Sequence, residues 1–126
     1  MPTDETRRRI LVVDDRLEMA ETLSDGLRDH GYDAEPVSSP FTAVKMLETQ
    51  TFDAVVTDLR MPGMDGLQLL AHARRLAPER PVIVMTAYGA IDTALESMRQ
   101  GASHHLLKPF RLEELLSVLR SSFERR

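Results

Sequence analysis

Five short apolar runs, three of them rich in β-branched residues, alternate with longer amphipathic segments along this chain of 126 residues. The runs 9–14, 33–37, 53–58, 81–86 and 104–108 are predicted strands, and the segments 17–30, 40–50, 66–77, 90–100 and 112–125 are predicted helices. This alternation predicts an α/β fold, a doubly wound five-stranded parallel sheet with helices on both faces. Because the run 33–37 carries charges and Pro36, we place it at an edge of the sheet.

Each predicted helix carries apolar side chains at the spacing of a single helical face. The stripes are Ala20, Leu23 and Leu27; Phe41, Val44 and Leu47; Leu70, Ala73 and Ala77; Ile91, Ala94, Leu95 and Met98; and Leu112, Leu115, Leu116, Leu119 and Phe123. Ser39 before Pro40 is typical of a helix start, and Gly31 and Gly101 are placed as helix C-terminal caps.

The chain contains no internal repeat and no second domain, so residues 1–126 are predicted to form a single domain. We expect residues 1–7 to be a flexible leader and residues 121–126 to begin a linker. A formal net charge of −4 argues against direct binding of nucleic acid or anionic membranes. The chain has no cysteine and no apolar run long enough to span a bilayer, so a cytoplasmic location is expected.

Polar side chains follow four of the five predicted strands. Asp14 and Asp15 follow the first strand, Asp58 ends the third, Thr86 ends the fourth and Lys108 ends the fifth. Because the carboxyl ends of parallel strands meet at one edge of the sheet, we expect these side chains to share one crevice. Each residue alone has an ordinary structural explanation, such as a turn or a solvated charge, so the inference depends on their coincidence.

Three carboxylates in one crevice repel each other unless cations compensate their charge. Lys108 can neutralise one charge, and an open site built from oxygen ligands suits Mg²⁺ for the remainder. A carboxylate beside Mg²⁺, a lysine and a hydroxyl is equipped to attack phosphorus. The residues therefore predict that Asp58 is a nucleophile toward a phosphoryl donor.

These motifs together resemble the receiver domain of two-component response regulators. The resemblance covers residues 8–124 and rests on "LVVDD", "VVTDLRMPGMDG", "VIVMTAYG" and "LLKPF", in the order and spacing of that family. The segments "TDLRMPGMDG" and "MTAYGAIDTALESMRQGA" are most similar to receivers of σ54-dependent transcriptional activators. The resemblance implies a flavodoxin-like fold with strand order 2-1-3-4-5, counted along the chain.

The resemblance also implies a phosphorylation site and a metal site. Asp58 would be phosphorylated, and Asp15 and Asp58 would ligate Mg²⁺ directly. Asp14 would act on the metal through water, and the backbone carbonyl of Arg60 would complete the protein ligands.

The remaining motif residues would serve the phosphoryl group and the switch. Thr86 and Lys108 would bind the phosphoryl group from two sides, with the Lys108–Pro109 bond cis. His105 stands where the family usually has the aromatic switch residue, which puts that switch in doubt. Tyr88 and Arg60 each lie two residues past a site residue, so we predict that they flank the path of an attacking water.

The resulting hypothesis is a phospho-accepting signalling switch that is not an enzyme toward other substrates. No nucleotide-binding loop is present, so a sensor histidine kinase would supply the phosphoryl group in trans. Phosphorylation would change the face formed by the segments 90–100, 104–108 and 112–125, which is expected to contact a partner or a second copy. The alternatives are a degenerate receiver acting as a constitutive interaction module, a phosphohydrolase, and a flavin-binding domain.

Overall fold

Strands and helices alternate throughout the computed structural model, which describes residues 7–87 and 91–124. The strands are β1 (Arg9–Val13), β2 (Asp33–Val37), β3 (Ala54–Asp58), β4 (Val82–Thr86) and β5 (His104–Leu107). The helices are α1 (Leu17–Asp29), α2 (Pro40–Thr49), α3 (Gly66–Leu76), α4 (Ile91–Arg99) and α5 (Leu112–Glu124). The predicted elements are therefore confirmed, with ends that differ by a residue or two.

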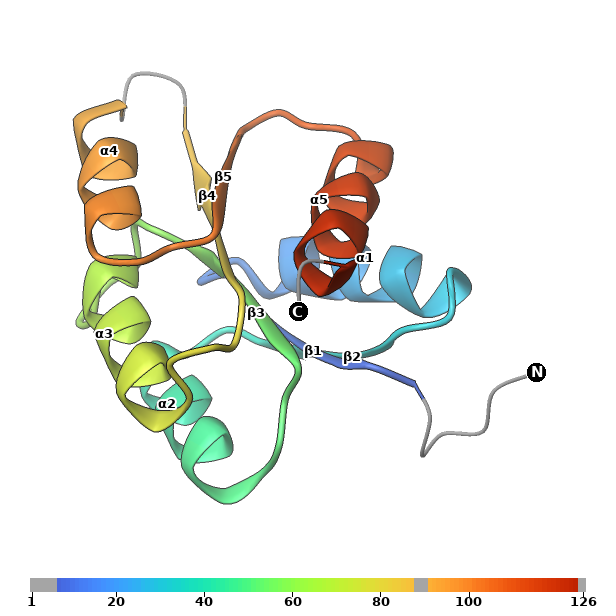
Figure 1. The fold of residues 1–126 in the computed structure, drawn as a ribbon, viewed down its shortest axis with the longest axis horizontal. Coiled ribbons are helices and arrows are strands. Elements are labelled where there is room, and N and C mark those ends of the chain that lie inside the picture. Colours follow the sequence, from blue (N-terminus) through green and yellow to red (C-terminus); the bar gives the residue numbers. More distant parts are fainter. Residues whose placement is uncertain (1–6, 88–90, 125–126) are drawn as a thin grey trace.

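The strands form one parallel sheet with the order β2-β1-β3-β4-β5 (Figure 1). β2 lies at an edge, as Pro36 predicts, because proline has no amide hydrogen to donate to a second neighbour. The order confirms the doubly wound, flavodoxin-like arrangement expected from the resemblance.

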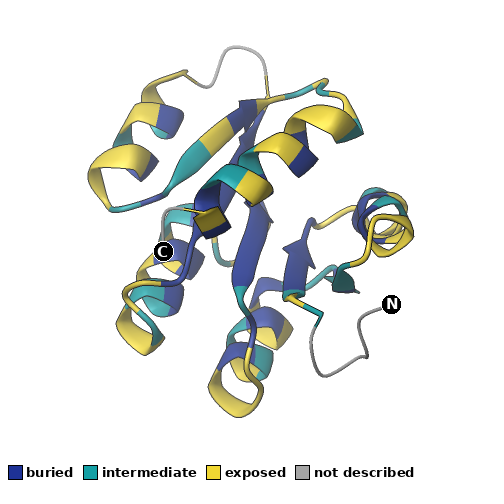
Figure 2. Ribbon diagram, turned by 45° about the vertical axis from the view of Figure 1, so that its right-hand side comes forward, coloured by how far each residue is buried: buried dark blue, intermediate teal, exposed yellow. Residues whose placement is uncertain are grey.

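Helices cover both faces of the sheet and create two separate apolar layers. In β1, Ile10 and Val12 pack toward α1 and α5, whereas Leu11 and Val13 pack toward α2 and α3. The central strands are buried on both faces, as their uninterrupted apolar composition predicts (Figure 2). No described helix has both the length and the apolar character needed to cross a membrane.

The helix boundaries follow from capping interactions encoded locally. The Ser39 hydroxyl accepts a hydrogen bond from the Thr42 amide at the start of α2, which confirms its predicted role. Gly31 and Gly101 have φ angles of 93° and 102°, in the left-handed region that favours glycine. These glycines let the chain turn sharply from α1 and α4 into the next strands.

Two of the predicted apolar stripes are only partly correct. Phe41 is 55% exposed, because α2 packs through Pro40, Ala43 and Leu47 instead. In α4 the buried residues are Ala94 and Ser97, whereas the larger Ile91, Leu95 and Met98 are 59%, 49% and 38% exposed. Small side chains let α4 approach the sheet closely, and its bulky apolar residues consequently face outward.

Candidate functional site

Strand register brings the predicted site residues to one edge of the sheet. Val13 pairs with Thr57 across β1 and β3, so Asp14 and Asp58 follow on adjacent strands. On the other side of β3, Asp58 pairs with Met85, and Thr86 pairs with Leu107 of β5. The Lys108 amide donates to the Thr86 carbonyl at 2.7 Å, which carries Lys108 to the same edge.

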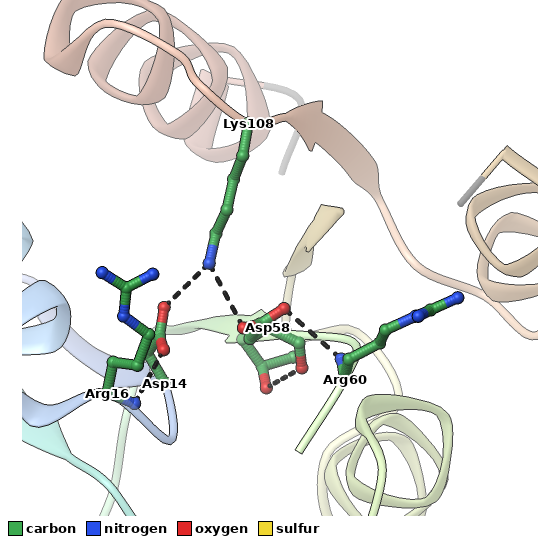
Figure 3. A network of polar contacts seen from close by, with 6 residues as sticks. Asp14, Arg16, Asp58, Arg60 and Lys108 are labelled. Atoms are coloured by element: carbon green, nitrogen blue, oxygen red, sulfur yellow. Dashed lines mark hydrogen bonds and ion pairs between the residues drawn. The ribbon is translucent and has the colours of Figure 1, made fainter. Parts of the chain in front are cut away.

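Lys108 joins the two most buried acids of this cluster. Its Nζ donates to Asp14 Oδ2 at 3.0 Å and to Asp58 Oδ2 at 3.2 Å (Figure 3). The side chains of Asp14, Asp58 and Lys108 are 0%, 13% and 22% exposed, so water screens these charges weakly. The peptide bond between Lys108 and Pro109 is cis, as the resemblance implies.

Backbone amides fix the orientation of both carboxylates. Asp14 Oδ1 accepts from the Arg16 amide at 2.9 Å, and Asp58 Oδ1 accepts from the Arg60 amide at 3.3 Å (Figure 3). Sequence reasoning missed the Arg16 contribution. An aspartate followed by a turn commonly accepts from the amide two residues later, so the signal was present in the sequence.

Close contact between α3 and the end of β3 holds the loop after Asp58 in place. The Gly66 amide donates to the Leu59 carbonyl at 2.9 Å. A Cβ atom at Gly66 would collide with the backbone carbonyl of Asp58 and with Leu59 Cα. Asp65 and Gln68 form a reciprocal capping box that starts α3 at this point.

The electrostatics of the cluster are unbalanced in favour of negative charge. Burial raises the pKa of Asp58, and the Asp14 carboxylate adds to this effect, although Lys108 opposes it. Burial alone would lower the pKa of Lys108, but its contacts with Asp14 and Asp58 outweigh burial and raise it. Lys108 therefore remains protonated at neutral pH and does not fully compensate the acids around it.

The three acids together present a donor set that fits a hard divalent cation. One carboxylate oxygen from each of Asp14, Asp15 and Asp58 lies within 4.8 Å of the others. Asp15 is exposed, so the cluster opens to solvent on that side. Oxygen ligands with access for water suit Mg²⁺, and its charge would oppose the burial and the Asp14 repulsion that raise the pKa of Asp58.

The other predicted site residues surround this cluster less directly. Thr86 is buried at the end of β4, and within the described residues its hydroxyl donates no hydrogen bond to Asp58. Arg60 and His105 are exposed. Tyr88 lies outside the described residues. The structure thus brings Asp14, Asp58 and Lys108 into contact and places Thr86 on the adjacent strand.

Sequence comparison identifies a protein family that matches most of the chain. Residues 10–120 match the response regulator receiver domain. Response regulator protein FleR of Pseudomonas aeruginosa is 44% identical over 111 residues, covering 88% of this chain and 24% of FleR. Transcriptional regulatory protein ZraR of Escherichia coli is 38% identical over 110 residues, covering 87% and 25%. The chain therefore spans about a quarter of the length of these relatives.

Solved structures with the same arrangement confirm the fold. A response regulator receiver domain protein from Clostridium thermocellum has a TM-score of 0.89 at 28% identity, covering 94% of this chain and 95% of that one. NtrX from Brucella abortus in complex with ADP has a TM-score of 0.90 at 29% identity, covering 95% of this chain and 28% of NtrX.

Proposed function

We propose that this chain, which belongs to the response regulator receiver domain family, is a phospho-accepting switch with Asp58 as the acceptor. The observation that carries this proposal is the position of the Asp58 carboxylate, between a lysine ammonium and two further acids at an open edge of the sheet. Each of these residues alone has an ordinary structural explanation, whereas phosphoryl transfer accounts for the acid pair, the acceptor and the lysine meeting in one place.

In the proposed reaction, an Asp58 carboxylate oxygen attacks the phosphorus of a phosphohistidine on a sensor kinase. The new P–O bond forms as the P–N bond breaks, and the histidine nitrogen leaves with the bonding electrons. Lys108 Nζ, which already donates to Asp58, would pair with a phosphoryl oxygen and offset charge there. Asp58 would leave the reaction as an acyl phosphate.

Asp14, Asp15, Asp58 and the Arg60 carbonyl would hold Mg²⁺ in this proposal. When bound, the ion would neutralise charge on the phosphoryl oxygens. The chain itself supplies the positioning, because the amides of Arg16 and Arg60 already orient the two buried carboxylates. No separate substrate is turned over, so the domain acts as a switch and not as an enzyme in the usual sense.

The proposed response to phosphorylation is a change of the face formed by α4, β5 and α5. Thr86 would donate its hydroxyl to the phosphoryl group and draw the chain after β4 toward the site. Four large apolar residues are exposed on this face, namely Ile91, Leu95, Met98 and Leu107. A homodimer or an effector contact through this face would cover it, and His105 lies exposed beside Leu107 on β5.

A role in transcription control and a cytoplasmic location are part of the same proposal. FleR and ZraR are regulators by name and are much longer than this chain. A constitutive interaction module is the second candidate, and the histidine at position 105 is the observation that favours it, because it departs from the family's aromatic residue.

The proposal is tested by incubating the protein with acetyl phosphate and Mg²⁺ and measuring its intact mass. We expect a gain of one phosphoryl group that disappears in Asp58→Asn and when the metal is chelated. Asp29→Asn is the matched control, because Asp29 is an exposed acid of α1 remote from the cluster. A wild-type protein that gains no mass under these conditions would favour the constitutive module.

A further inference from the structure

A pocket lined by several arginines lies at the end of the molecule opposite the acid cluster. It has a volume of about 270 Å³ and is lined by Arg7, Arg8, Gly31, Tyr32, Arg120, Phe123 and Glu124. Arg8 immediately precedes β1 and Tyr32 immediately precedes β2, so the pocket lies at the amino ends of these strands. Since all strands are parallel, this is the edge farthest from Asp58.

Among the described residues, the charges that line this pocket are predominantly positive. Arg7, Arg8 and Arg120 line it together with one acid, Glu124. In the part of the chain that the structure describes, neither Arg8 nor Arg120 forms an ion pair with a carboxylate. Both side chains are exposed, so their guanidinium groups are accessible to an anion from solution.

Aromatic packing holds the pocket's donors in position. The Arg8 guanidinium carbon lies over the Phe123 ring, 4.2 Å from the ring centroid. The centroids of the Tyr32 and Phe123 rings are 6.3 Å apart. Stacking leaves the edge of the guanidinium, which carries its N–H donors, available to a ligand. Burial raises the pKa of Tyr32, although the charges of Arg120 and Arg8 oppose this, so its hydroxyl stays protonated as a donor.

We propose that this pocket binds a phosphate group, either free or carried on a small organic molecule. Two guanidinium groups and a phenolic hydroxyl are three donor groups, whereas a carboxylate has only two oxygens. A phosphate group has enough oxygens to accept from all three groups. The volume of the pocket suits one such group and is smaller than typical sites for drug-sized ligands. The site is independent of Asp58 and of any metal held by the acid cluster.

The proposal is tested by titrating isotope-labelled protein with inorganic phosphate in chelator-containing buffer at constant ionic strength. We expect saturable amide chemical-shift changes at Gly31, Tyr32 and Arg120, with a single dissociation constant. A parallel titration with ribose 5-phosphate separates the two sources: tighter binding than inorganic phosphate indicates an organic phosphate, and equal binding indicates the free ion. Shifts that increase linearly without saturating would overturn the proposal.

Variants assign the binding to particular side chains. Arg8→Gln and Arg120→Gln should each weaken phosphate binding about tenfold or more, and Tyr32→Phe about fivefold. Arg75→Gln, which changes an exposed arginine of α3, should leave the dissociation constant unchanged. The Arg120 side chain is exposed and makes no hydrogen bond among the described residues, so this variant should keep the fold. An unchanged constant in the Arg8→Gln, Arg120→Gln double variant would contradict the proposal.

Discussion

Among the individual residues, Asp58 is the one whose environment most clearly opposes its function, because its carboxylate lies where a negative charge is disfavoured. It is largely buried, it lies near Asp14, and its pKa is raised even though Lys108 contacts it at 3.2 Å. A raised pKa means that the folded protein disfavours the ionised carboxylate relative to the unfolded chain. In the metal-free protein the ionised Asp58 carboxylate therefore lowers stability at neutral pH, a cost typical of functional sites.

Removing the Asp58 charge should consequently stabilise the metal-free protein. In Asp58→Asn we expect the free energy of unfolding to rise by about 1 kcal/mol, which raises Tm by a few degrees. Thermal unfolding in chelator-containing buffer at neutral pH measures this, with Asp29→Asn as the control. A Tm equal to or below that of the wild type would show that Asp58 is not under electrostatic strain.

Removing Lys108 should have the opposite effect, because it leaves two buried acids without a cation. We expect Lys108→Met to lower the stability of the metal-free protein by about 2 kcal/mol, since the lysine is partly exposed and a fully buried pair would cost more. Mg²⁺ should restore more stability to this variant than to the wild type. Lys45→Met, at an exposed position of α2, is the matched control in denaturant unfolding. Equal midpoints for the two variants would contradict the account.

Two contacts between secondary-structure elements determine how the site is built and how α4 presents its apolar residues. The start of α3 packs directly on the end of β3, where Gly66 leaves no room for a side chain. On the other side, α4 is held by the small residues Ala94 and Ser97 and turns its bulky residues outward. The first contact fixes the loop after Asp58, and the second leaves α4 with an uncovered apolar surface.

Adding a methyl group at Gly66 should disturb the loop after Asp58. We expect Gly66→Ala to destabilise the protein by about 1–3 kcal/mol, because the new atom meets backbone that cannot move aside. Gly26→Ala is a useful comparison, since the three atoms nearest to its methyl group would all belong to the side chain of Leu112. Urea unfolding should give a lower midpoint for Gly66→Ala than for Gly26→Ala, and the reverse order would refute the packing argument.

A polar residue on the outward face of α4 should weaken self-association of the activated protein. Sedimentation of the protein with beryllofluoride and Mg²⁺ should detect a dimer that Leu95→Gln weakens about tenfold, because a buried leucine contributes roughly 1.5–3 kcal/mol. Acetyl phosphate should still phosphorylate this variant. Leu76→Gln is the control, because Leu76 is 40% exposed on α3. Equal dimerisation of the two variants would place the contact elsewhere.

For the molecule as a whole, the features that local sequence patterns determine were predictable from the sequence. Alternating elements identified the sheet, and Pro36 identified β2 as an edge. Parallel strands made the convergence of Asp14, Asp58 and Lys108 predictable without any contact information. The orientation of α4 was not predictable in this way. Ala94 and Ser97 are spaced as a buried helical face would be, and so are the larger apolar residues of this helix. Only packing against the sheet decides which of the two faces is buried.

Identification of the phosphorylated residue tests directly whether Asp58 is the phosphoryl acceptor. The protein is phosphorylated with acetyl phosphate and Mg²⁺, the acyl phosphate is reduced with borohydride, and the peptides are sequenced by mass spectrometry. We expect homoserine at position 58 and unchanged aspartate at positions 14 and 15. Reduction at either of those positions, or at none of the three, would contradict this assignment.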